Sequence, residues 1–116
     1  MVKVPKQGDI LLLDTAPRFG HKQVGRRPYL VLSHDLIAQT SNVVIVAPIT
    51  TTRRSYPLYL DLSSLGTDEL QTRGKIILDQ LTTIDYEVRE TQYLESLPRG
   101  ALRMVLAKAR TIFQLV

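Results

Sequence analysis

The sequence of 116 residues contains no cysteine. This absence excludes disulfide bonds, metal sites built on thiolates and a thiol nucleophile. A chain of this length forms one domain by default, so we expect a single domain over residues 1–116. Such a domain buries roughly two-thirds of its unfolded surface and needs no cross-links. A protein without cysteine fits the reducing cytoplasm, which is the location we expect.

Histidine is almost as rare, because the chain has only His21 and His34. These two residues are 13 positions apart, and no paired carboxylates accompany them at the spacing of metal ligands. We therefore expect no metal and no cofactor. His34 matches no motif, and we expect it to be structural.

Long apolar runs are also missing. The longest are about six residues, far short of the roughly 20 that a membrane-spanning helix needs. The N-terminal stretch MVKVPKQGD has no apolar core of the length that a signal peptide requires. We expect neither a membrane span nor a signal peptide.

Positive charge is in excess and unevenly placed. The net charge is +4. Residues 1–54 carry eight Lys and Arg against three Asp, whereas residues 55–116 carry seven Lys and Arg against eight Asp and Glu. A basic half of this kind indicates an anionic partner, with nucleic acid the first candidate. An ordinary solvated surface is the alternative.

Short apolar and β-branched runs recur along the chain, separated by segments rich in Gly, Pro and charge. They predict strands at Gly8–Asp14, Pro28–Ser33, Asn42–Thr50 and Tyr56–Leu62, and a strand with a turn in Gly74–Asp85. The segments Thr15–Arg26 and Thr51–Ser55 are expected to be loops. Pro48, near the end of the third strand, predicts an edge position or a bulge.

The last segment, SLPRGALRMVLAKARTIFQLV, predicts a helix with one apolar face. Residues on that face recur three or four positions apart: Leu102, Leu106, Ala109 and Phe113. Ser96 can cap the helix, and Pro98 fits its first turn. The arginines fall on another face, which we expect to be solvated: Arg99, Arg103 and Arg110. Five or so short strands and one terminal helix favour a mainly β fold, a small, strongly bent β-barrel with an added C-terminal α-helix.

The segment GRRP places Arg26 and Arg27 on a turn at the start of a strand. A guanidinium is always charged and can grip two phosphate oxygens in one plane. Pro28 fixes one backbone angle beside it, and the strand supplies rigidity. A surface turn that only aids solubility is the alternative, and the residues alone favour that alternative.

Five segments, taken in order, resemble the MazF/PemK family of type II toxins. They are GDILLLD, GHKQVGRRPYLVLS, VAPIT, LDQLTTID and the Pro-led C-terminal helix. The resemblance covers nearly the whole chain, and its most specific piece is the pattern G-H-x-Q-x-G-x-R-P. It implies an SH3-like barrel of the CcdB/PemK type with a C-terminal helix, and a homodimer.

The resemblance also implies an activity. Members of the family are sequence-specific endoribonucleases that cleave single-stranded RNA, such as mRNA, without metal, and an antitoxin protein keeps them silent. The ribose 2′-hydroxyl attacks its own phosphate, leaving a 2′,3′-cyclic phosphate and a 5′-hydroxyl. An acidic, partly disordered antitoxin is therefore an implied partner.

The catalytic residues most often assigned in the family match Arg27 and Thr50 here. Without the resemblance, Thr50 is an ordinary threonine at the end of a strand. Further residues are expected to contact RNA: Lys22, Gln23, Arg26, Thr51, Arg53 and Gln80. Tyr56 and Phe19 are candidates for stacking on bases, although core packing is favoured for Tyr56.

One position departs from the family pattern. Many relatives carry a glutamate between the histidine and the glutamine, where this chain has Lys22. A lysine is a cation at neutral pH and binds phosphate better than it accepts a proton. The resemblance implies His21 and Asp79 as the candidates for proton transfer, because each matches a residue that some relatives use, and the sequence leaves open which is the base and which the acid.

Two other functions compete with RNA cleavage. One is a non-enzymatic toxin that binds DNA gyrase, as CcdB relatives of the same fold do. The other is an SH3-like RNA-binding module in which Lys22 marks a lost base. The GRRP turn and Thr50 favour the nuclease, because a gyrase binder has no need of them.

Overall fold

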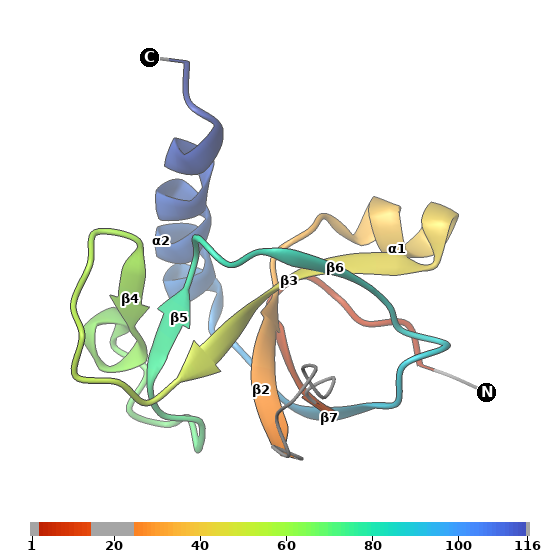
Figure 1. The fold of residues 1–116 in the computed structure, drawn as a ribbon, viewed down its shortest axis with the longest axis horizontal. Coiled ribbons are helices and arrows are strands. Elements are labelled where there is room, and N and C mark those ends of the chain that lie inside the picture. The colour runs from red at the N-terminus through yellow and green to blue at the C-terminus, as the bar shows by residue number, and fades with distance from the viewer. Residues whose placement is uncertain (1–2, 15–24, 116) are drawn as a thin grey trace, which may run out of the picture.

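The computed structural model describes residues 3–14 and 25–115. Figure 1 shows the sheet with a short helix at one end and a long C-terminal helix rising from it. The strands are β1 (Asp9–Asp14), β2 (Arg26–Val31), β3 (Val43–Thr50), β4 (Tyr59–Asp61), β5 (Lys75–Ile77), β6 (Thr82–Asp85) and β7 (Thr91–Ser96). The α-helices are α1 (Asp35–Ser41) and α2 (Arg99–Arg110), and the 3₁₀ turns are η1 (Leu62–Leu65) and η2 (Thr111–Phe113). No helix in this part of the chain is long and apolar enough to cross a membrane.

The strands form one antiparallel sheet in the order β4-β5-β3-β2-β1-β7, and β6 pairs with β3 outside this path. The expectation of a mainly β fold with a C-terminal helix is confirmed. Among the described strands the sheet is not closed, because β4 and β7 remain its two ends.

Strand β3 holds the two halves of the sheet together. It pairs with β6 over Val43–Val46, with β2 over Val46–Pro48, and with β5 from Ile49 onward. Pro48 therefore lies in an internal strand, and the expected edge position was wrong. It marks the point where β3 leaves β2 for β5, which suits a residue that has no N–H to donate.

The hydrophobic core lies on both faces of the sheet because side chains alternate along each strand. Leu30 belongs to the cluster beneath α2, whereas its neighbour Val31 belongs to the cluster on the other face. Helix α2 contributes the buried residues Ala101 and Val105 to the first cluster.

The C-terminal helix differs from its prediction at both ends. Ser96 does not cap it, because Ser96 ends β7 and its hydroxyl donates to Asp9 Oδ1 at 3.0 Å; the N-cap is Pro98. Leu102, Leu106 and Ala109 pack on the core as predicted. Phe113 does not, and is 79% exposed, because the chain tightens into η2 after Arg110 and the helical spacing no longer applies.

Helix α1 and strand β7 lie in segments where no helix or strand was predicted. His34 supplies the N-cap of α1, and its Nδ1 accepts the Leu36 N–H at 3.1 Å, which agrees with the structural role expected for it. The segment expected as one strand and a turn holds both β5 and β6.

The strand expected at Tyr56–Leu62 is shorter than predicted, because β4 spans only Tyr59–Asp61. The core packing favoured for Tyr56 was also wrong. Its side chain is 53% exposed and meets the Tyr59 ring edge-on, with centroids 5.0 Å apart.

Candidate active site

The two arginines of the GRRP turn belong to β2, and their surroundings differ. Arg26 Nε lies 3.1 Å from Asp14 Oδ1, and Arg26 Nη1 donates to Gln92 Oε1 at 3.3 Å. Both partners come from the neighbouring part of the sheet, since Asp14 ends β1 and Gln92 belongs to β7. Arg26 therefore ties β2 to β1 and β7 across one face.

Arg27 points to the opposite face, because consecutive residues of a strand alternate. Its side chain is exposed, and no ion pair or side-chain hydrogen bond joins it to another described residue. A permanent cation in this state keeps all its guanidinium hydrogens available for an anionic ligand.

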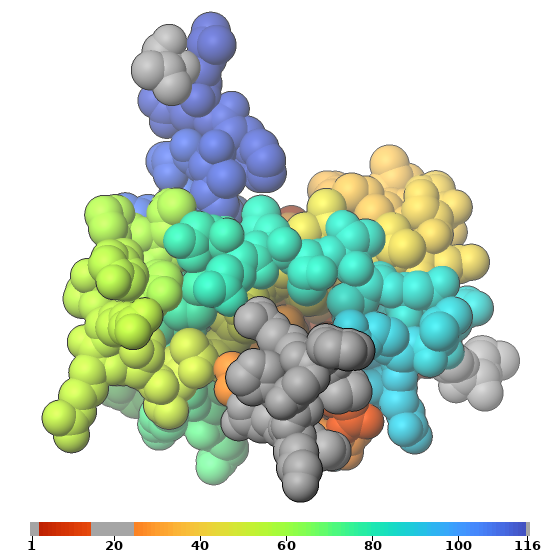
Figure 2. All heavy atoms as spheres, viewed as in Figure 1, coloured from red at the N-terminus to blue at the C-terminus, as the bar shows by residue number. Residues whose placement is uncertain are grey.

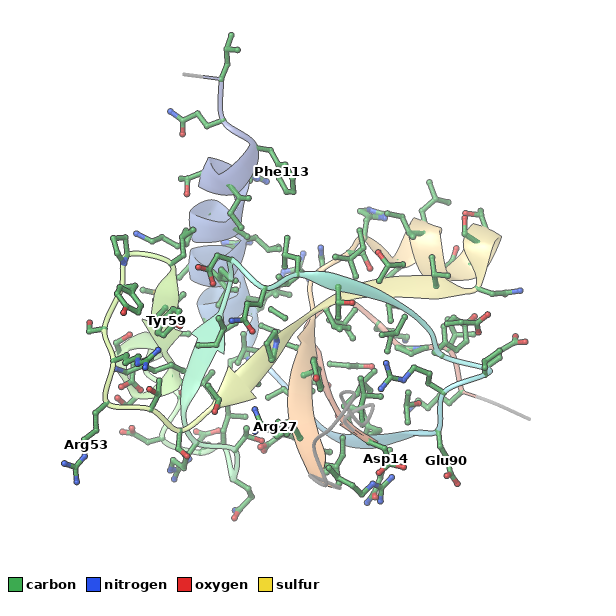
Figure 3. The ribbon with its side chains drawn as sticks, viewed as in Figure 1. Asp14, Arg27, Arg53, Tyr59, Glu90 and Phe113 are labelled. Carbon is green, nitrogen blue, oxygen red and sulfur yellow. The ribbon has the colours of Figure 1, made fainter. Side chains whose placement is uncertain are left out.

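Thr50 ends β3, on the strand next to Arg27. The last pair between β2 and β3 is Tyr29 with Pro48. Two positions further along each strand lie Arg27 and Thr50, so both follow the last pair at the same end of the sheet and on the same face. Here β3 turns toward β5, and Figure 3 shows the Arg27 side chain between β2 and the end of β3.

The loop after Thr50 is fixed through its backbone. Thr52 Oγ1 accepts the Arg54 N–H at 3.1 Å, and the Arg54 carbonyl accepts a bond from Lys75 Nζ at 2.6 Å. The side chains of Thr51 and Arg53 are exposed, and Figure 3 shows Arg53 reaching away from the sheet. The predicted RNA-binding loop thus presents cations outward from an anchored backbone.

Asp79 and Gln80 lie in the turn that follows β5, and both are exposed. The backbone of this turn is held by a bond from Gln80 N to the Ile77 carbonyl at 3.2 Å. Strand β3 separates this turn from β2. Asp79 comes four residues after Lys75, the partner of Thr50, a separation of at most roughly 13 Å along the chain. No described hydrogen bond links Asp79 to Arg27 or Thr50.

Three predicted site residues lie outside the described residues: His21, Lys22 and Gln23. In the described ranges 3–14 and 25–115, no group of three or more His, Cys, Asp or Glu side chains is placed to hold a metal ion.

The segment before β5 is anchored by a carboxylate that the sequence did not single out. Glu95 of β7 accepts bonds from Gln71 N at 3.1 Å, Thr72 N at 2.7 Å and Thr72 Oγ1 at 2.6 Å. Burial acts to raise the pKa of Glu95, but the bonds from Thr72 and Gln71 and the nearby Arg73 charge together lower it below its ordinary value of 4.5. The segment is therefore fastened to β7 at neutral pH.

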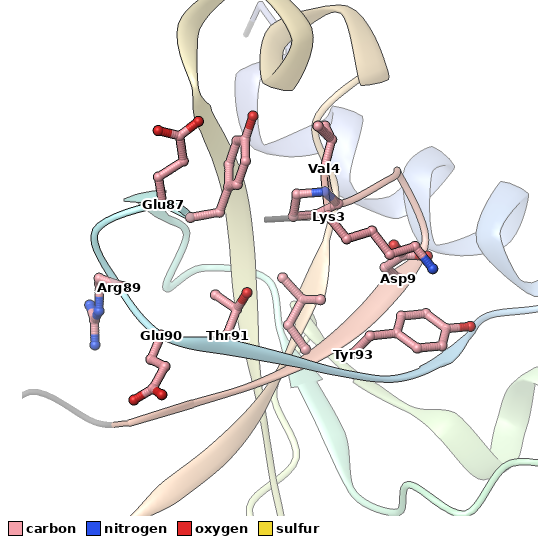
Figure 4. A pocket seen from close by; sticks show the side chains of 11 residues that line it. Lys3, Val4, Asp9, Glu87, Arg89, Glu90, Thr91 and Tyr93 are labelled. Carbon is pink, nitrogen blue, oxygen red and sulfur yellow. The ribbon is translucent and has the colours of Figure 1, made fainter. Parts of the chain in front are cut away.

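A separate cavity of about 300 Å³ opens between the N-terminal segment, β1 and β7 (Figure 4). The charged residues that line it are two cations, Lys3 and Arg89, and three carboxylates, Asp9, Glu87 and Glu90. The Asp9 carboxylate is already engaged by Lys6 N and the Ser96 hydroxyl. A lining with more anions than cations does not suit a phosphate ligand.

Comparisons with known proteins show what the chain is similar to. A family model described as PemK-like, MazF-like toxin of type II toxin-antitoxin system matches residues 6–113. Endoribonuclease PemK of Escherichia coli is 29% identical over 110 residues, covering 92% of this chain and 80% of the relative. Endoribonuclease EndoA of Bacillus subtilis is 31% identical over 84 residues, covering 71% and 72%. A crystal structure of MazE-MazF from Deinococcus radiodurans superposes with a TM-score of 0.81 at 28% identity, covering 97% of each chain.

Proposed function

Because the chain belongs to the PemK-like, MazF-like toxin family of type II toxin–antitoxin systems, we propose that it is a sequence-specific endoribonuclease that cleaves single-stranded RNA. The relatives named above as endoribonucleases support this activity. The observation that carries the proposal is the unpaired guanidinium of Arg27 beside the end of β3, where Thr50 lies.

The substrate brings its own nucleophile in this proposal. The ribose 2′-oxygen attacks the adjacent phosphorus, and the bond from phosphorus to the 5′-oxygen of the next nucleotide breaks. The products are a 2′,3′-cyclic phosphate and a 5′-hydroxyl. The protein has to remove the 2′-proton, stabilise the charge on the phosphorane and supply a proton to the leaving 5′-oxygen.

Arg27 meets the second requirement. Two of its N–H groups match two phosphate oxygens in one plane, and negative charge grows on those oxygens in the transition state. The Thr50 hydroxyl donates to a non-bridging oxygen on the same face. Because β2 and β3 are paired up to Tyr29 and Pro48, both groups are carried by a rigid sheet.

His21 and Asp79 share the proton transfers, one as base and the other as acid. Asp79 is exposed in its turn, and it needs no movement of the core to reach a bound strand. The pH profiles of the two single variants, Asp79→Asn and His21→Ala, assign the roles, because the base gives the acidic limb and the acid the basic limb.

The remaining cations and polar groups hold the RNA strand. Arg53 and Thr51 meet it from the loop after β3, and Gln80 from the turn after β5. Lys22 and Gln23 act from the segment between β1 and β2. Arg26 keeps Nη2 for phosphate, since Asp14 and Gln92 engage its other described donors.

We propose a homodimer and an antitoxin as protein partners. The solved MazE-MazF complex supports the antitoxin. Three large apolar side chains of α2 and the residues that follow it are exposed, at 52%, 79% and 95%: Met104, Phe113 and Leu115. Burial of such side chains against a second copy would remove them from water. We place the activity in the cytoplasm, where mRNA is translated.

Incubating the purified protein with a long single-stranded RNA in EDTA tests the function. We expect fragments ending in a 2′,3′-cyclic phosphate and beginning with a 5′-hydroxyl, cut at one recurring sequence. Binding without cleavage would leave an RNA-binding module, and neither binding nor cleavage would leave the gyrase binder; either result would refute the nuclease.

A further inference from the structure

Lys75 lies at the centre of a row of polar residues beside the proposed site. It opens β5, opposite Thr50 of β3 on one side and Asp61 of β4 on the other. Residues directly opposite each other in antiparallel strands lie on the same face, with their Cβ atoms about 5 Å apart. The Lys75 ammonium therefore belongs to the face that carries the Thr50 hydroxyl.

The ammonium donates its hydrogen bond to the loop, while its charge also helps to lower the pKa of the neighbouring Asp61 carboxylate, after the bonds from Ser63. Lys75 Nζ donates to the Arg54 carbonyl at 2.6 Å, across 21 residues of sequence. The Asp61 carboxylate accepts the N–H and the hydroxyl of Ser63, both at 2.9 Å. Because a bond from an ammonium is stronger than one between neutral groups, it ties the loop 51–55 to β5.

The residue before Lys75 allows β5 to approach β3 closely. Gly74 has φ +124°, and a Cβ there would lie 2.7 Å from the Thr50 carbonyl oxygen. The Gly74 carbonyl in turn accepts the Leu62 N–H at 3.0 Å. Figure 1 shows the end of β3 next to β5. The start of β5 thus contacts both Thr50 and the loop that follows it.

We propose that Lys75 is a positioning residue for RNA cleavage, whose ammonium holds the loop 51–55 so that Thr50 and Arg53 face the substrate. This inference rests on the proposed nuclease function. The mechanism above assigns Lys75 no contact with the reacting phosphate. Its effect passes through the Arg54 carbonyl and the backbone on either side of it.

Lys75→Met removes the ammonium and keeps most of the stem, while Lys75→Arg keeps a charged donor. In single-turnover cleavage of one RNA, we expect Lys75→Met to lower the rate constant roughly tenfold and Lys75→Arg to recover most of it. Amide hydrogen exchange in residues 51–55 should be faster in Lys75→Met alone. Lys6→Met is the matched control, since the exposed Lys6 side chain has no partner among the described residues.

The outcomes separate this inference from the proposed function. If the wild type cuts no RNA, both fail. If the wild type cuts and Lys75→Met matches Lys6→Met in rate and exchange, only the positioning role fails. If Lys75→Met weakens RNA binding with unchanged exchange in residues 51–55, Lys75 contacts RNA directly and the positioning role fails. Lys75→Gln repeats the comparison should Lys75→Met lower the melting temperature.

Discussion

Arg26 and Arg27 are neighbours in β2 and carry the same charge, but their surroundings differ. Arg26 is paired with Asp14 and Gln92, while the side chain of Arg27 forms no hydrogen bond or ion pair with the described residues. Consecutive side chains of a strand point to opposite faces of the sheet. Arg26 therefore points to the face where it reaches Gln92 of β7, and Arg27 points to the other face. Residue type alone does not distinguish the two arginines, and only the family resemblance gave Arg27 the catalytic role. The partners of Arg26 could not be predicted, because they depend on the pairing of β1 with β2 and β7.

Gly74 is a single position where a methyl group would disturb the site. Gly74→Ala forces a Cβ to within 2.7 Å of the Thr50 carbonyl oxygen, so the end of β3 must shift. We expect RNA cleavage to fall by about tenfold or more. The measurement is the single-turnover rate constant on a fixed RNA.

The control is Gly66→Ala. Gly66 also has positive φ, at +69°, but no atom lies within 4 Å of the added Cβ. Gly66→Ala should lose about 1–2 kcal/mol of stability from its left-handed backbone conformation, Gly74→Ala should lose more because its Cβ also meets the Thr50 backbone, and only Gly74→Ala should lose activity. Equal activity in the two variants would show that Thr50 tolerates displacement.

Strand β3 shows how far the sequence predicts an element. The run NVVIVAPIT predicted a strand ending at Thr50, and β3 ends there. The pairing of β3 with β2, β5 and β6 could not be predicted, because it depends on contacts between segments that are distant in the sequence. Helix α1 was also missed, since its seven residues, DLIAQTS, include only one buried side chain, Ala38, and so show little apolar periodicity.

Helix α2 is attached to the sheet through few buried side chains. Val105 is fully buried, whereas its neighbour Met104 is 52% exposed. Val105→Ala should lower the free energy of unfolding by about 2 kcal/mol, because it removes buried methyl groups and leaves a void. Chemical denaturation measures this loss.

Met104→Ala is the companion variant for α2 and should cost much less in the same experiment. A similar loss in the two variants would contradict the assignment of Val105 to the core.

Glu95, which holds Gln71 and Thr72, should make the stability of the fold depend on pH. The pKa of Glu95 is lowered in the folded protein from its ordinary 4.5, so its bonds to Gln71 and Thr72 stabilise the fold fully above pH 4.5. That contribution is lost as the pH falls through the lower folded value. Glu95→Gln should be less stable than the wild type at pH 7, and the difference should shrink below pH 4.5.

Melting temperatures across pH 3–7 measure this effect of Glu95. Ser63→Ala is unsuitable as a control because Ser63 bonds to another carboxylate, Asp61. Glu87→Gln is suitable, since Glu87 is exposed and its side chain has no described partner. A constant difference between Glu95→Gln and the wild type at all pH values would contradict the assignment.

At the scale of the whole molecule, the described strands form one sheet that runs from β4 to β7. Figure 2 shows the C-terminal end of the chain, in blue, projecting beyond the rest of the molecule, whereas Ala101 and Val105 of α2 are buried in the core. The open sheet was not anticipated by the barrel prediction, because closure depends on how β3 divides its pairing among β2, β5 and β6. The mainly β class could be predicted from the short apolar runs in the sequence, whereas the order of the strands in the sheet could not.

RNA affinity should depend on salt through the cations of the proposed site. Four phosphate contacts, from Lys22, Arg26, Arg27 and Arg53, would give a slope of about −3 in a plot of log K against log salt concentration. Binding of a 2′-deoxy analogue, which cannot be cut, measures this slope. Independence of salt would place RNA elsewhere on the molecule.

The most direct measurement is the single-turnover cleavage rate of Arg27→Ala, taken together with its affinity for the 2′-deoxy analogue. We expect a rate at least 100-fold lower, a much smaller loss of affinity and an unchanged melting temperature, while Arg103→Ala on α2 behaves as the wild type. A wild-type rate in folded Arg27→Ala, or a loss of affinity that accounts for the whole loss of rate, would contradict this expectation.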